Sequence, residues 1–145
     1  MNALTNSGLN IFYIAACNSN SDVLQYLLTN YSSMVEQTAD QNAGTALHEA
    51  CISGILQNVK LLFECADIKS FDKGDINGTT PLHAATYHGH HEIVKYILSQ
   101  SEVKSIDINK VDILGQTPED VARILGHTKV LEMFEMWRFK SEFKR

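Results

Sequence analysis

Four histidines lie close together in this sequence, at His83, His88, His90 and His91, and imidazole is a common metal ligand and proton carrier. His88 and His91 have the spacing of one helical turn. A glycine, Gly89, lies between them and would interrupt the helix that aligns the two rings. A metal site needs rigid support, and no cysteine or carboxylate completes a ligand set. We therefore favour a structural role for these histidines and expect no metal and no cofactor.

The other reactive residue types form no catalytic pattern. Cys17, Cys51 and Cys65 are odd in number and lack CxxC spacing, which predicts reduced thiols rather than disulfides or a zinc site. The adjacent acids Glu119 and Asp120 would point about 100° apart on a helix, so they do not form a paired carboxylate site. The sequence has no GxSxG, phosphate-loop or HExxH motif. We expect that the protein is not an enzyme.

The histidines belong to a repeated unit. Its clearest copy is DINGTTPLHAATYHGHHEIVKYIL at residues 75–98, and weaker copies recur along the chain. The threonine of the unit appears as Thr45, Thr80 and Thr117, with Asn10 in the equivalent place, so the steps are 35, 35 and 37 residues. A period in this range is typical of a solenoid of stacked helical pairs.

Each unit predicts a turn followed by two helices. Gly78 supplies a backbone free to take a positive φ in the turn. Thr80 is suited to cap a helix and Pro81 to occupy its first position, while Gly89 would end that helix. A second helix is indicated by apolar residues at helical spacing. In the clearest copy these are Ile93, Val94, Ile97 and Leu98.

The pattern DxxGxTPLHxAAxxGHxxIVxxLL resembles the ankyrin repeat, a hairpin turn with two antiparallel helices. The resemblance covers about residues 5–39, 40–74, 75–111 and 112–136, with a helical cap or tail at 137–145. It implies a single all-α domain over 1–145, an ankyrin-repeat solenoid of four helix-turn-helix repeats with β-hairpin-type loops. It also implies that His83 and His90 form hydrogen bonds at helix ends and between repeats.

Several residues depart from the pattern. Asn58 is polar where the outer helix normally buries an aliphatic residue, so we expect the second copy to be the least stable. In the same copy, Ala43 and Gly44 displace the turn glycine by one position. In the fourth copy, Glu119 and Asp120 replace the leucine and histidine, which favours acidic residues in a first helical turn over hydrogen bonding between repeats.

The tail from Val130 onward places Val130, Phe134 and Trp137 on one helical stripe, with Phe139 and Phe143 continuing its apolar content. We expect it to prolong the last outer helix. A terminal repeat has one bare side, so a capping role is favoured. A helix that docks onto a partner is the alternative.

The chain of 145 residues has a net charge of −5, and the charge is uneven. Residues 128–145 contain five basic and three acidic groups, which leaves seven basic and fourteen acidic groups for the rest. An acidic array repels phosphate backbones, so we expect no nucleic-acid binding. There is no apolar run of ~20 residues and no basic N-terminal region, which predicts no membrane span and no secretory signal. We expect a cytoplasmic monomer, with the nucleus as a possible location.

The resemblance implies a protein-interaction module, an adaptor or inhibitor that binds a protein partner in a concave groove. The alternative is a regulatory or targeting subunit, or a fragment, of a larger enzyme assembly. The groove positions are those that the repeat pattern leaves free, in the turns and at the ends of the inner helices. They are Gln41, Asn42, Ile52, Ser53, Ile76, Asn77, Thr79, Tyr87, His88, Ile113, Leu114 and Gln116. Ile124 and Leu125 hold the equivalent inner-helix positions in the fourth copy, with packing against the tail as the alternative.

Overall fold

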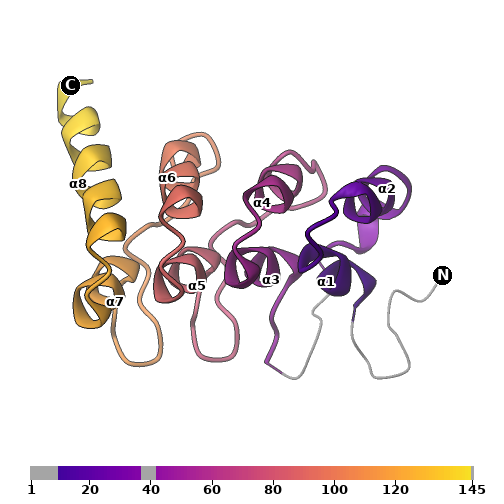
Figure 1. Cartoon of the computed structure of the whole chain (residues 1–145), viewed down its shortest axis with the longest axis horizontal. Coiled ribbons are helices and arrows are strands. Elements are labelled where there is room, and N and C mark those ends of the chain that lie inside the picture. The colour runs from indigo at the N-terminus through magenta and orange to yellow at the C-terminus, as the bar shows by residue number, and fades with distance from the viewer. Residues whose placement is uncertain (1–9, 37–41, 145) are drawn as a thin grey trace.

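The computed structural model describes residues 10–36 and 42–144, and the regular secondary structure in this part of the chain is helical. The helices pair as α1 (Ile11–Ala16) with α2 (Asp22–Tyr31), α3 (Ala46–Ser53) with α4 (Leu56–Phe63), α5 (Pro81–Tyr87) with α6 (His91–Gln100), and α7 (Pro118–Leu125) with α8 (Thr128–Phe143). A short 3-10 turn, η1 (Ser32–Met34), follows α2. The pairs stack in chain order, with the first helices of the pairs in one row and the second helices in another (Figure 1). The predicted all-α solenoid is confirmed.

The inner helices α3, α5 and α7 begin with the same local device, a reciprocal capping box. In α5 the Thr80 hydroxyl accepts from the His83 backbone N–H, and His83 Nδ1 accepts from the Thr80 N–H, each at 3.2 Å. In α7 the carboxylate of Asp120 replaces the imidazole and accepts from the Thr117 N–H at 3.0 Å. These hydrogen bonds to Thr117 hold the pKa of Asp120 below its usual range. The box satisfies donors that a helix N-terminus otherwise leaves unpaired.

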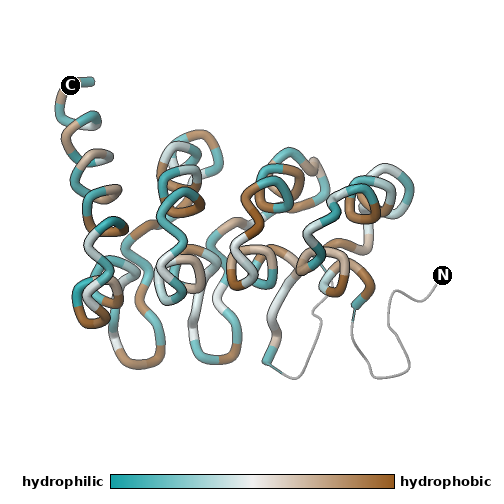
Figure 2. The backbone as a smooth tube through the Cα atoms, in the orientation of Figure 1, coloured by the Kyte–Doolittle hydropathy of each residue, from teal (hydrophilic) through white to brown (hydrophobic). Residues whose placement is uncertain are grey.

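The core lies between the two rows of helices. Inner helices contribute small side chains, such as the fully buried Ala50, Ala85 and Ala122, which allow neighbouring helices to approach closely. Outer helices contribute larger side chains, such as Phe63 and Ile97. Hydrophobic stretches of the chain recur on each outer helix where it approaches the inner row (Figure 2). Each pair therefore buries its apolar surface both between its own two helices and against the neighbouring pairs.

Backbone hydrogen bonds join each loop to the loop of the preceding repeat. The Ile76 N–H donates to the Asn42 carbonyl and the Ile113 N–H to the Asn77 carbonyl, both at 2.8 Å. Gly78 has a φ of +71°, and Ala43, at the equivalent place in the preceding loop, has a φ of +58°. Ala43 thus takes the left-handed conformation, and Gly44, which follows it, does not.

The first two pairs are joined through Asn58, whose side chain is completely buried. Its Nδ2 donates to the carbonyls of Ala16 at 3.0 Å and Asn18 at 2.9 Å, where the preceding inner helix ends. Its Oδ1 has no hydrogen-bond partner among the described residues. An aliphatic residue would bury more apolar surface here, but it would leave these two carbonyls without this donor.

We predict that Asn58→Asp lowers the free energy of unfolding by about 3 kcal/mol at pH 7. The carboxylate has the same shape, but it cannot donate and it would bury a charge against two carbonyl oxygens. Urea unfolding followed by circular dichroism would measure the change. The matched control is Asn109→Asp, because Asn109 is exposed and the same change there should alter stability by less than about 0.5 kcal/mol. Equal effects at the two sites would contradict the role of Asn58.

We predict that Ala43→Gly raises the free energy of unfolding by about 0.5–1 kcal/mol. A left-handed conformation costs alanine roughly 1–2 kcal/mol, and the gain exceeds the extra entropy that glycine gives the unfolded chain. The same urea titration would measure it. The control is Ala66→Gly, at an exposed loop residue without a positive φ, where glycine should not stabilise the fold. A loss of stability in Ala43→Gly would exclude strain at this position.

Candidate protein-binding groove

His48 connects the inner helix α3, and His83 the inner helix α5, to the loop of the next repeat. His48 Nε2 lies 2.8 Å from the Thr79 carbonyl oxygen, and His83 Nε2 lies 2.8 Å from that of Gln116. In both rings Nδ1 faces the N–H of its own capping threonine, so Nδ1 accepts and Nε2 donates. Each imidazole is therefore held in one tautomer and fixes the backbone of a loop whose side chains remain free.

Two further histidines, at the starts of the outer helices α6 and α8, connect back to the preceding repeat. His90 Nε2 donates to the Ile52 carbonyl and His127 Nε2 to the Tyr87 carbonyl, each at 3.0 Å. A Cβ on Gly54 would lie only 2.6 Å from the His90 ring, so the close approach requires glycine. We call the four contacts made by His48, His83, His90 and His127 the histidine ladder. The predicted hydrogen bonding of His83 and His90 is confirmed.

The backbone segments held by this ladder surround two adjoining hollows of about 220 and 390 Å³. Both hollows are lined by Thr79, Tyr87, Asp112 and Val121, and we refer to them together as the groove. Eight of the twelve predicted positions line it. They are Ile52, Asn77, Thr79, Tyr87, His88, Ile113, Leu114 and Gln116.

Three other predicted positions do not line the groove. Asn42 and Ile76 lie where neighbouring loops pair, and Ser53 donates its hydroxyl to Glu49 on the same helix. Gln41 lies outside the described residues. The sequence pattern identified the loops and helix ends correctly, but it did not separate residues beside the groove from those lining it.

Ile124 and Leu125 line the groove, with exposed fractions of 64% and 43%, instead of packing against the tail. The sequence signal for their groove position was their place at the end of an inner helix, just before Gly126. Four lining residues were missed, namely His83, Ala84, Asp112 and Val121. Asp112 is the aspartate that opens the repeat pattern, and its Oδ1 accepts from two backbone N–H groups of its own loop. That carboxylate therefore shapes the rim of the groove.

The groove is lined mainly by apolar side chains, and it also contains the exposed imidazole of His88. Tyr87, Ile113 and Leu114 are 59%, 73% and 75% exposed, and the loop tips before α5 and α7 are hydrophobic (Figure 2). The pKa of His88 is lowered, first by desolvation and then by the nearby rings of His90 and His127, with Glu49 opposing the shift. The lowered pKa favours the neutral form of the His88 ring, and the acidic residue of the groove lining is Asp112.

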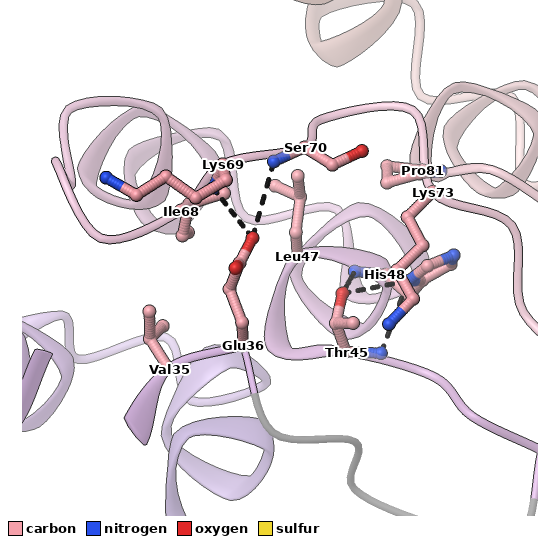
Figure 3. Close-up of a pocket in the computed structure, with 10 residues that line it drawn as sticks. All are labelled: Val35, Glu36, Thr45, Leu47, His48, Ile68, Lys69, Ser70, Lys73 and Pro81. Atoms are coloured by element: carbon pink, nitrogen blue, oxygen red, sulfur yellow. Dashed lines mark hydrogen bonds between the residues drawn. The ribbon is translucent and has the colours of Figure 1, made fainter. Parts of the chain in front are cut away.

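A separate hollow of about 220 Å³ lies at the boundary between the first two repeats (Figure 3). The Glu36 carboxylate points into it and accepts from the backbone N–H groups of Lys69, at 2.7 Å, and Ser70, at 3.3 Å. On the opposite side, Thr45 and His48 bind each other. The Glu36 hydrogen bonds hold the two repeats together, so we assign this hollow to the scaffold.

Comparison with known families agrees with this geometry. A family model described as ankyrin repeats, in three copies, matches residues 1–72 and 68–135. The chain belongs to the ankyrin-repeat family, whose domains are generally protein-interaction modules. A search of curated proteins finds no match.

Two further findings bear on the classes considered above. In the described residues, no helix combines the length and the apolar character needed to cross a membrane. Within residues 10–36 and 42–144, no three side chains of histidine, cysteine, aspartate or glutamate are arranged to hold a metal ion. Each of the four ladder histidines is instead engaged with a backbone carbonyl.

We predict that the pKa of His88, measured by NMR titration of its ring protons, lies below 6.5. The unfolded chain then binds more protons than the folded chain near pH 6, so this residue makes stability fall as pH drops below about 6.5. His88→Gln should flatten that part of the stability profile relative to the wild type. A measured pKa above 6.5 would show that the ring is not desolvated.

Proposed function

We propose that this protein is an adaptor or inhibitor that binds a protein partner through the groove. The observation that supports this most directly is the cluster of exposed apolar side chains around it, including Tyr87, Ile113, Leu114 and Ile124. A contiguous apolar patch on a rigid scaffold is typical of an interaction surface. Tyrosine is also frequent among the residues that dominate binding energy.

Affinity would come from burial of these side chains in the complex. Burying a large apolar side chain contributes about 1.5–3 kcal/mol. The ladder already fixes the backbone that presents Tyr87, Ile52 and Gln116, so less conformational entropy is lost on binding. The partner segment should therefore carry apolar anchors where it enters the groove.

We further propose a monomer in a reducing compartment such as the cytosol. The three cysteines are free thiols, and Cys51 is buried. Burial raises the pKa of the Cys51 thiol, which keeps it protonated and unreactive. Free thiols are typical of proteins in the cytosol.

We predict that Tyr87→Ala combined with Leu114→Ser weakens binding of the physiological partner at least tenfold, while circular dichroism and the thermal midpoint remain within error of the wild type. Both side chains are largely exposed, so their loss removes contact area without opening the core. Quantitative affinity capture from source cells would identify proteins retained by the wild type only. Calorimetry with the purified partner would then measure the affinity.

The matched control combines Tyr26→Ala with Val103→Ser. These residues are 59% and 79% exposed and are not among those lining the groove. The control should bind as the wild type does. Equal loss of binding in both double variants, or no loss in either, would mean that the groove is the wrong surface.

A further inference from the structure

The last outer helix, α8, extends beyond the surface that it packs against. It packs on α6 and α7, yet only Val130 and Phe134 are buried along its sixteen residues. From Arg138 to Lys144 every side chain except Ser141 is exposed. Figure 1 shows α8 projecting well past the end of α6. The final two turns therefore contribute little to the core.

A narrow cleft of about 100 Å³ separates α8 from α6 at the base of this projection. Leu98, Met133, Met136 and Trp137 line the cleft, with Lys95 and Lys140 among its lining residues. The volume suits one apolar side chain. Methionines are flexible and adapt to the shape of an inserted group.

An exposed apolar stripe continues from the cleft toward the end of α8. Met136, Phe139 and Phe143 follow the spacing i, i+3 and i+7, which places them on one face. They are 45%, 61% and 77% exposed, and the two phenyl rings lie 4.7 Å apart. This stripe is separate from the groove, which α8 does not line.

The charges of α8 are segregated around the helix. Glu135 and Glu142 lie near Arg138, which also forms an ion pair with Glu119 of α7. Lys140 and Lys95 border the cleft, and none of the described acidic side chains pairs with either of them.

At its two ends, the apolar stripe is bounded by opposite charges. Lys144 follows directly after Phe143 and is exposed. Glu132 lies one turn before Met136 and is also exposed. The apolar surface is thus bordered by lysines beside the cleft and at the end of the helix.

We propose that the cleft between α6 and α8, together with the Met136, Phe139 and Phe143 stripe, docks an acidic amphipathic segment of a partner protein. One apolar side chain of that segment enters the cleft, and its carboxylates pair with Lys95, Lys140 and Lys144. A second copy of this chain is the alternative occupant, and sedimentation of the full chain distinguishes it from a partner segment. This surface is independent of the groove and does not rest on the function proposed for it.

The test uses Trp137, the single tryptophan of the chain, as a reporter within the cleft. The full chain is titrated with a blocked helical peptide of leucine, alanine and glutamate, whose leucines are spaced i, i+4 and i+7. We expect a saturable blue shift of Trp137 emission that weakens as salt is raised. Lys95→Glu with Lys140→Glu should raise the dissociation constant at least tenfold. The control is Lys69→Glu, at an exposed loop residue far in sequence from α8. It also replaces a positive charge by a negative one, and it should leave binding intact.

Four results would overturn the proposal. The first is no response of Trp137 to the glutamate peptide, and the second is equal binding of a matched peptide with lysine for glutamate. The third is concentration-dependent association in sedimentation that Phe139→Ser with Phe143→Ser abolishes, because the occupant would then be a second copy. The last is a Trp137 shift with anionic phosphatidylserine vesicles but not with the peptide, since the face would then bind lipid.

Discussion

The structure depends on the ability of one imidazole ring to form two different hydrogen bonds, one through each nitrogen. His83 accepts from the cap of its own helix through Nδ1 and donates to the loop of the next repeat through Nε2. A carboxylate can only accept and an ammonium can only donate, so neither could make both bonds. The capping of one helix and the placement of the next loop are thereby coupled, and repeats two to four share one register.

The two ends of the array show what happens where this coupling is absent. In the last repeat Asp120 keeps the cap but offers no donor to a following loop, and Glu119 binds Arg123 and Arg138 on its own repeat. Between the first two repeats, Asn58 supplies the donor from within the outer helix. Both solutions satisfy polar groups with residues that the repeat pattern does not favour.

The sequence was sufficient to predict the helix pairs, since Thr-Pro caps, glycine ends and a regular period are local signals. It predicted much of the groove for the same reason, because repeat positions map directly onto space. It could not assign Asn58 a role, since its partners are carbonyls forty residues away. It assigned Ile124 a groove position but left packing against the tail as the alternative, because which of the two this helix end faces depends on how α8 leaves the array.

The ladder also explains why recognition and stability can change separately in this molecule. The four carbonyls that accept from the ladder histidines belong to Ile52, Thr79, Tyr87 and Gln116, and the side chains of all four line the groove. Their backbones are therefore fixed by interactions that do not involve their side chains. A substitution that retains the backbone, such as Tyr87 to another residue, changes what the groove presents while the hydrogen bond from His127 remains. Binding specificity can thus be altered one position at a time on a scaffold that stays in register.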